Sequence, residues 1–398
     1  MSDAPAWRPT TAFVVAATVG CALLLLAGAT RRPALVLVAA PLLTEVAWSL
    51  ARGPRPGLRL AVRAGVTRAR EGDDVAVSVD VHAADDADAV LTALEPRPLL
   101  GPLAPLRPTL DLPAEASRTL RARAVHWGRA PTAQAVAVAW AGHGLLRLDP
   151  VAVTGATLTV EPAALRVALR GPRPRTGVVG PRPSRRTGAG GDLTGVRGFA
   201  AGDRLRHVHW RVTARRGDLH VTTTTADHEA ALLLAVDTGT AFSPTDDPTG
   251  GATTLDLAVR TAASLARVHL RAGDRVGVVD LGDPTRVLRP GTGHRHLDRV
   301  VDRLVQARRT APADLRRLPE IVARTAPGAH VVVVSPLLRP AVGDGVARLA
   351  QSGVQVAVVD VLDPDLDRRR LPAAPRLLLL ERDATVDRLT AVGVEVRP

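Results

Sequence analysis

The strongest constraint on this chain is an uncharged, apolar run at residues 11–29 that is rich in Val, Ala and Leu. As a helix, a run of about 19 residues comes close to crossing the roughly 30 Å hydrocarbon core of a bilayer. A cleaved signal peptide is the alternative. The run is long for the apolar region of a signal peptide, however, and a second apolar run follows at once. It therefore predicts a transmembrane helix.

The second apolar run covers residues 34–50 and contains Pro41 and Glu45. This run could form a kinked span, a re-entrant segment or an interfacial helix. We expect a span. The two runs then form a transmembrane hairpin within residues 1–52. Trp7 and Trp48 stand where the aromatic belt of a membrane protein would place them.

The arginines around this hairpin predict its orientation. Arg8 precedes it and four arginines lie between residues 52 and 63, whereas Arg31 and Arg32 lie in its turn. Because positive charge collects on the cytoplasmic side, both ends are expected in the cytoplasm. We predict a multi-pass protein of the cell membrane whose soluble domains are cytoplasmic.

The composition limits the classes of partner. A formal net charge of +13 is typical of nucleic-acid binders, whose arginines neutralise phosphates. Here Tyr is absent and aromatic residues make up 2%, so the stacking platforms of a single-strand binder are missing. We expect no nucleic-acid binding. The single cysteine, Cys21, excludes a disulfide framework and a cysteine-rich zinc site within one chain.

Three segments follow the hairpin. Residues 58–165 alternate apolar and polar side chains, as at 75–81 and 135–140, which predicts a small β-sandwich-like domain. Residues 166–192 are crowded with Pro, Gly and Arg, which is typical of a linker. Residues 193–398 form the remaining domain.

This last domain is predicted to be α/β, because apolar strand patterns alternate with helical ones and predict a parallel sheet wrapped by helices. Ligands of such sheets bind beyond the carboxyl ends of the strands, where Asp237 and Ser335 lie. The expected strands are 231–236, 275–281, 330–334 and 354–361, and the expected helices are 255–270, 297–308 and 342–350.

A segment at residues 195–220 holds the most specific pattern. Asp203 is expected to cap a helix that Gly217 ends, and a strand is expected at residues 219–225. The spaced residues that make up the pattern are Arg197, Gly202, Asp203, Arg206, His209, Trp210, Ala214, Arg215, Gly217 and Leu219.

This spacing resembles the signature of the bacterial family called domain of unknown function 58. The resemblance implies an N-terminal transmembrane hairpin, a β-domain and a von Willebrand A-like (Rossmann-type) C-terminal domain. It also implies association with a MoxR-type AAA ATPase as the partner, and it names no reaction.

Two roles are open for the signature residues. Asp203 and the arginines would form a polar network that locks the linker to the domain, with Trp210 packed against the sheet. Alternatively, Arg206 and Arg215 offer a surface for bidentate contacts with an acidic partner.

The resemblance also raises the question of a metal site. Von Willebrand A domains often hold a divalent cation with an Asp-x-Ser-x-Ser loop, a later Thr and an Asp after a central strand. Here Gly239 and Ala241 replace both serines, and Ser335-Pro336 ends the central strand without a carboxylate. Asp237 alone keeps its place. We expect no cofactor, and Mg²⁺ or Mn²⁺ at Asp237 is the alternative.

The sequence contains no Gly-x-Ser-x-Gly elbow, Walker loop or His-Glu-x-x-His motif. We therefore expect that the protein is not an enzyme. We expect a membrane-anchored adaptor or scaffold that docks a MoxR-like AAA ATPase or its client. Two alternatives are a metal-dependent, adhesion-type ligand-binding module and a binder of anionic polymer.

Overall fold

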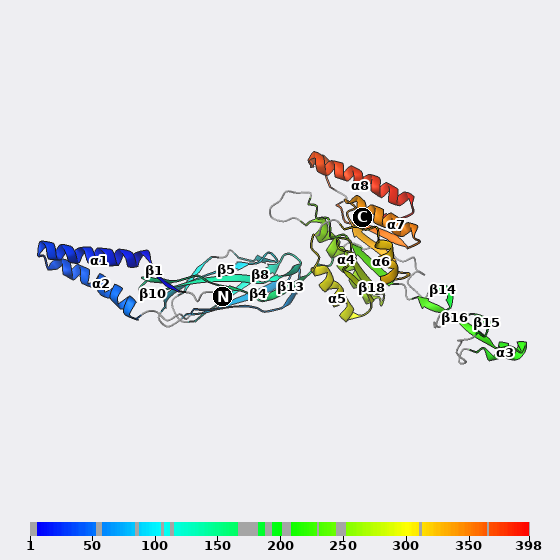
Figure 1. Ribbon diagram of the computed structural model, residues 1–398, viewed down its shortest axis with the longest axis horizontal. Helices are drawn as coiled ribbons and strands as arrows, with labels where there is room; N and C mark the ends of the chain where they lie inside the picture. Colours follow the sequence, from blue (N-terminus) through cyan, green and yellow to red (C-terminus); the bar gives the residue numbers. More distant parts are fainter. Residues whose placement is uncertain are drawn as a thin grey trace. The chain divides into compact units, whose positions relative to one another are not determined.

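The computed structural model divides into two compact units, Met1–Ala163 and Ala164–Pro398, and each is described by itself (Figure 1). The mixed α/β chain has two apolar N-terminal helices and several sheets. The described residues are 6–52, 58–83, 87–104, 107–111, 115–165, 182–187, 193–200, 208–228, 231–243, 252–309, 313–363 and 366–397.

The first unit begins with a helical hairpin of α1 (Thr11–Thr30) and α2 (Ala34–Arg52). Both helices are long and apolar enough to cross a membrane. They pack closely at Gly20, where an added Cβ would lie 2.8 Å from side-chain atoms of Leu43. Small residues allow this close approach between helices in lipid, where packing replaces the hydrophobic effect as the driving force.

The amino end of the hairpin belongs to a β-sheet. Strand β1 (Trp7–Pro9) pairs antiparallel with β11 (Leu146–Leu148). Thr10 caps α1 and donates its backbone N–H to the Leu145 carbonyl at 2.8 Å. Trp7, which the sequence predicts for an aromatic belt, lies in β1 and packs against the buried core of the β-strands.

The carboxyl end of α2 meets the same region. Glu45 accepts a hydrogen bond from the ring of His143, in the turn between β10 and β11, and this contact raises the pKa of His143. Ser49 is buried, and an added Cβ on Gly142 would lie 3.0 Å from its Cβ. Both ends of the hairpin are therefore fixed to one β-turn.

Strand β1 and the strands within residues 59–161 form three sheets. The largest has the order β1-β11-β10-β5-β7, with β12 also on β10; the others are β2-β4-β8-β6 and β3-β13-β9. The bounds not yet given are β2 Arg59–Ala64, β3 Arg68–Arg70, β4 Asp74–His82, β5 Ala87–Pro96, β6 Leu100–Pro102, β7 Thr109–Asp111, β8 Glu115–Ala124, β9 Gly128–Pro131, β10 Ala133–Ala141, β12 Val151–Thr154 and β13 Thr157–Glu161.

These sheets pack through two buried clusters. In β4 every second residue from Val75 to Val81 is buried, as in β10 from Ala133 to Ala141, which is the alternation expected of strands with one face inward. Val79 and Ala137 share one cluster, so the sheets that contain β4 and β10 lie face to face.

The second unit contains a six-stranded sheet of order β19-β18-β17-β20-β21-β22. All neighbours are parallel except the antiparallel edge strand β19. The strands are β17 Ala231–Val236, β18 Arg275–Asp280, β19 Val287–Gly291, β20 His330–Ser335, β21 Val356–Asp360 and β22 Glu395–Arg397.

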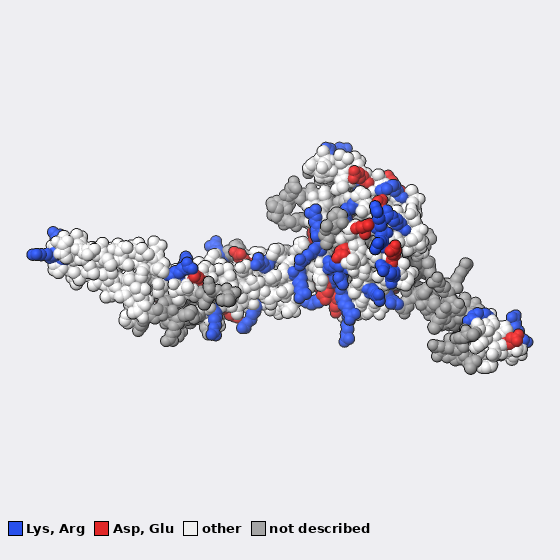
Figure 2. All heavy atoms as spheres, in the orientation of Figure 1, with Lys and Arg blue, Asp and Glu red and all other residues white. Residues whose placement is uncertain are grey.

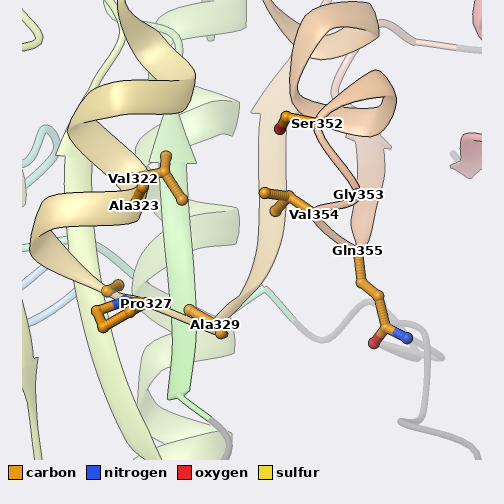
Figure 3. A pocket seen from close by; sticks show the side chains of 10 residues that line it. Val322, Ala323, Pro327, Ala329, Ser352, Gly353, Val354 and Gln355 are labelled. Atoms are coloured by element: carbon orange, nitrogen blue, oxygen red, sulfur yellow. The ribbon is translucent and has the colours of Figure 1, made fainter.

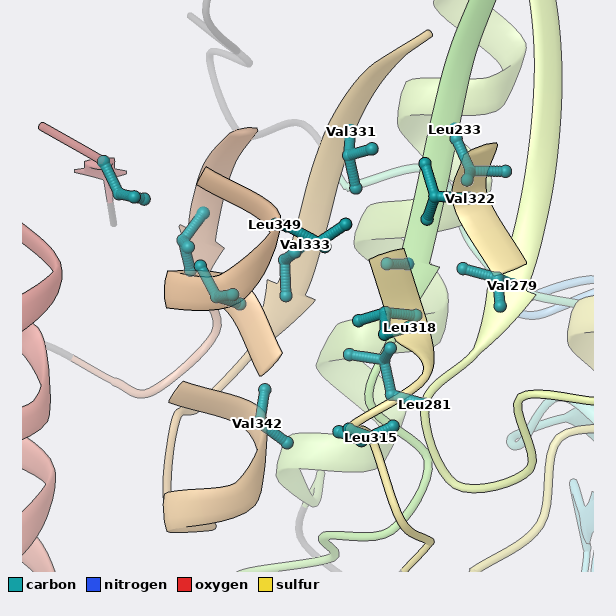
Figure 4. Packing of buried hydrophobic residues seen from close by; sticks show 14 of the residues in the cluster. Leu233, Val279, Leu281, Leu315, Leu318, Val322, Val331, Val333, Val342 and Leu349 are labelled. Carbon is teal, nitrogen blue, oxygen red and sulfur yellow. The ribbon is translucent and has the colours of Figure 1, made fainter. Parts of the chain in front are cut away.

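Helices pack against this sheet. Residues of α6, α7 and α8 share one buried cluster with Leu233, Val331 and Val333 (Figure 4), while α4 contacts β17, β18 and β20. The alternating strands and helices that the sequence predicts are present, and β19, α6, α8 and β22 are additional. The helices are α4 Thr254–Arg271, α5 His294–Val305, α6 Leu318–Thr325, α7 Pro340–Gln351 and α8 Ala373–Ala391.

A smaller three-stranded sheet precedes β17. In it, β14 (Arg182–Thr187) and β15 (Leu193–Gly198) both pair antiparallel with β16 (His220–His228), and the short helix α3 (Trp210–Arg216) lies between β15 and β16. Part of the predicted linker is thus a strand.

We predict that Leu349→Ala, which removes a fully buried side chain of α7, lowers the free energy of unfolding of the second unit by about 2–5 kcal/mol. The control Leu380→Ala removes a side chain that is 65% exposed on α8, and we expect a change within about 0.5 kcal/mol. Hydrogen exchange of the amides of β20 and β21, in the full chain, measures both. Equal effects would contradict the assigned core.

Candidate functional site

The carboxyl ends of four strands of the parallel sheet bring polar residues together, and we call this edge the rim. Asp237 follows β17, Asp280 ends β18, Ser335 ends β20 and Asp360 ends β21. Asp237 and Ser335 lie at this edge, as the sequence predicts, and the structure shows that they are in contact: Ser335 Oγ donates to Asp237 Oδ2 at 2.8 Å. Both residues are fully buried, so this part of the rim is closed to solvent.

The Asp237 carboxylate has a full set of hydrogen-bond donors. Oδ1 accepts from Arg339 Nη2 at 2.6 Å and from the Gly239 N–H at 3.1 Å. Oδ2 accepts from Ser335 Oγ and, at 3.4 Å, from Thr240 Oγ1. A carboxylate has about four lone-pair sites, so these four donors use its acceptor capacity.

Arg339 reaches Asp237 from the loop between β20 and α7, and it lies directly against Gly239. A Cβ added to Gly239 would lie 2.4 Å from Arg339 Cζ, so a side chain there would have to displace the guanidinium. The Arg339 side chain is 13% exposed. Among the described residues, no acceptor lies within hydrogen-bond distance of its Nε and Nη1.

The neighbouring strand end repeats the pairing of an aspartate with an arginine. Asp280 accepts hydrogen bonds from the Thr238 hydroxyl and, at 2.9 Å, from the Gly282 N–H. Arg286 Nη1 lies 3.6 Å from Asp280 Oδ2. Thr238, which follows Asp237, is thereby committed to Asp280.

A third pair closes the rim at β21. Arg382, from α8, donates to Asp360 and, through Nε, to the Pro336 carbonyl at 3.0 Å. Burial raises the pKa of Asp360, against the opposing effects of the Leu362 N–H and the Arg382 guanidinium. Arg382 therefore links β21 to the loop that carries Arg339.

This geometry does not fit a divalent cation at Asp237. Mg²⁺ and Mn²⁺ need several oxygen ligands with free lone pairs, and the Asp237 oxygens already accept from four donors. Within the described ranges, no three or more His, Cys, Asp or Glu side chains are grouped to hold a metal ion.

The signature residues lie elsewhere, in the small sheet and α3. Gly202, Asp203 and Arg206 fall outside the described residues. Arg197 lies in β15 with its side chain exposed, and Arg215 is in the last turn of α3. Arg197 and Arg215 thus lie in the small sheet and its helix and not in the elements that form the rim.

Helix α3 corrects two expectations. The predicted start at Asp203 is wrong, because His209 is the N-cap and Val208 pairs with Val221 as a β-bridge. The predicted end is confirmed, with Gly217 in the left-handed conformation at φ 80°. Trp210 does not pack against a sheet, since its side chain is 65% exposed. No residue of α3 is buried.

The opposite end of the parallel sheet carries a groove of about 430 Å³ (Figure 3). It is lined by ten residues of the segments 322–329 and 352–355, and none of them is charged. Next to it, His330 begins β20, and Gln355 is one of the lining residues. This end offers no ionised group on its lining to bind a ligand or act on one.

Comparison with known proteins assigns the family. Residues 195–397 match the model of a family described as "Protein of unknown function DUF58". This chain belongs to the DUF58 family. The matched range begins in β15 and runs through α3 and the six-stranded sheet, so it includes both the signature and the rim of this DUF58 protein.

Curated relatives of the DUF58 protein include uncharacterized proteins of Mycobacterium tuberculosis and Mycobacterium bovis. They are 28% identical over 216 residues, which cover 53% of this chain and 66% of theirs, just under two thirds of their length.

Among solved structures, a chain from the complex of Zinc 2-glycoprotein and Prolactin inducible protein from human seminal plasma aligns at 13% identity. The alignment covers 26% of this chain and 96% of that one. Its TM-score of 0.19 is too low to bear on the fold.

His330 predicts a pH dependence of stability. Burial, first, and the nearby His269 lower its pKa below the ordinary value near 6.5, against the opposing effects of Gln355 and Glu395. The unfolded chain then binds more protons than the folded one as pH falls through and below about 6.5, so stability is lost in that range.

We expect His330→Gln to weaken this loss, measured as the urea midpoint of the second unit between about pH 5 and pH 7.5. An unchanged pH dependence in the variant would show that other groups cause the loss.

Proposed function

We propose that this DUF58 protein is a membrane-anchored, non-catalytic adaptor that docks a MoxR-like AAA ATPase or its client on the cytoplasmic side. One observation carries the docking role: Trp210 is largely exposed on a helix that also bears Arg211, Arg215 and Arg216. The family resemblance, and not the geometry, suggests the ATPase.

Membrane anchoring is supported by the surface of the hairpin. Leu25 is 76% exposed and Leu37 is 78% exposed, and large apolar side chains in such numbers need lipid or a partner to cover them. On the face of the hairpin that Figure 2 shows, charged side chains appear only near the ends. Arg31 and Arg32 lie between α1 and α2.

The orientation is supported by the way in which the hairpin is mounted. Strand β1 and the end of α2 both contact the β10–β11 turn, so residues on the two sides of the hairpin lie on one side of any membrane that it spans. The arginine count around the hairpin favours the cytoplasm for that side.

The order of the parallel sheet supports a von Willebrand A-like, Rossmann-type domain. Numbered from β17, the strands run 3-2-1-4-5-6, which is the order of doubly wound dinucleotide-binding sheets. In those sheets the ligand lies at the carboxyl ends of the strands, whereas here the equivalent rim is closed by three aspartate–arginine contacts. A closed rim favours function through a surface.

Helix α3 is suited to such a surface. Tryptophan and arginine are the side chains most enriched among residues that dominate binding energy. The guanidinium groups of Arg211, Arg215 and Arg216 favour a partner that offers carboxylates. Gly217 and His209 cap the helix, which stabilises the backbone that carries Trp210.

We predict that protease added to inside-out membrane vesicles degrades everything after residue 58 and leaves a protected fragment that contains α1 and α2. In right-side-out vesicles the same domains should be protected. Protection of the C-terminal unit in inside-out vesicles would overturn the proposed orientation.

Affinity purification of the full chain from detergent-solubilised membranes tests docking. We expect a MoxR-like ATPase in the eluate, and at least about tenfold less of it with Trp210→Ala or Arg215→Ala, the loss typical of a binding hot spot. Arg376→Ala, which removes an exposed arginine of α8, is the matched control and should change nothing.

Absence of the ATPase, or equal recovery with all three variants, would count against the adaptor. Recovery of nucleic acid or another polyanion that is lost steeply with salt would instead favour the polymer binder.

A further inference from the structure

Arg339 lies where a metal ion would bind at the rim. Its guanidinium donates to the carboxylate that a metal ion would use, at 2.6 Å, and it lies in contact with Gly239 at the same time. We infer that Arg339 is the resident cation of the rim. It takes the place of a divalent ion beside Asp237, so the rim holds its arrangement without metal.

One departure from the metal-binding pattern is explained by this contact. The pattern has serine where this chain has Gly239, and a Cβ at that position would overlap the Arg339 guanidinium where it lies here. The contact between Arg339 and Asp237, far apart in sequence, therefore needs the glycine at 239.

The same guanidinium fixes the loop after β20. Ser335 Oγ donates to Asp237 and accepts from the Leu337 N–H at 2.9 Å, while Leu337 has a positive φ of 55° and a buried side chain. This conformation is unfavourable for a leucine and needs support from its surroundings. Arg339, two residues later, supplies part of that support through Asp237.

An arginine and a metal ion differ in how they can be removed. A bound ion exchanges with solution and responds to its concentration, whereas the guanidinium is covalently attached and stays charged at physiological pH. The Asp237–Arg339 pair is thus constitutive. The rim has one arrangement at all metal concentrations, and the chain is not a metal-gated module.

Removal of the guanidinium should uncover a cation site. It leaves Asp237 with free lone pairs beside the hydroxyl groups of Ser335 and Thr240, which are the oxygen ligands that Mg²⁺ and Mn²⁺ take. Water would complete the coordination. Arg339→Ala is therefore expected to be sensitive to metal although the wild type is not.

Hydrogen exchange in the detergent-solubilised full chain is the suitable measurement. All five tryptophans lie at or before residue 210, so none lies in the six-stranded sheet or its helices to report on the rim. Peptides from residues 231–243 and 331–343 cover both sides of the contact. In the wild type, millimolar MgCl₂ or MnCl₂ should leave their exchange unchanged.

In Arg339→Ala we expect exchange of these peptides to be at least about tenfold faster, and millimolar Mn²⁺ to reverse most of that increase. The double variant Asp237→Asn, Arg339→Ala should lose the metal response. Gly239→Ser is an independent route, since its side chain displaces the guanidinium and adds a hydroxyl ligand; it should also become sensitive to metal. Arg376→Ala is the control and should behave like the wild type.

Slower exchange of the wild-type peptides in metal would overturn the inference, because a cation would then bind Asp237 with Arg339 present. A lack of metal response in both Arg339→Ala and Gly239→Ser would overturn it as well. Neither result depends on whether an ATPase binds to α3.

Discussion

The contact between Asp237 and Arg339 is the interaction on which the organisation of the C-terminal domain depends. It joins the end of β17 to the loop before α7 at the centre of the sheet, in a site from which solvent is excluded. A buried carboxylate without a partner costs several kcal/mol, so removal of the arginine would leave an unfavourable charge. The conformation of the loop after β20 and the glycine at 239 are both tied to this pair, and two further aspartate–arginine contacts complete the rim.

The regular elements could be predicted because their cause is local. Buried parallel strands appear as continuous apolar runs, and amphipathic helices show an apolar residue every three to four positions. For this reason β17, β20 and α7 lie within two residues of their expected bounds. Short edge strands such as β19 and β22 lack such a pattern. Helix α8 was missed because its apolar residues do not form one stripe.

The site was less predictable, because its contacts join distant parts of the chain. Asp237 and Ser335 were expected at one edge from the order of the strands alone, but no short-range pattern links Arg339 to Gly239. The exposure of Trp210 was missed for a similar reason. Val208 pairs with Val221, so α3 begins at Trp210. The Gly202-Asp203 pair predicts an earlier start, which would place Trp210 within the helix.

The pairing of β1 with β11 has a consequence for biosynthesis. Residues 7–9 are synthesised long before their partners at 146–148, which follow strands β2–β10. The pairing closes a long loop, and loop closure of this kind is slow. The amino end of the helical hairpin can therefore join its sheet only after most strands of the first unit have been made.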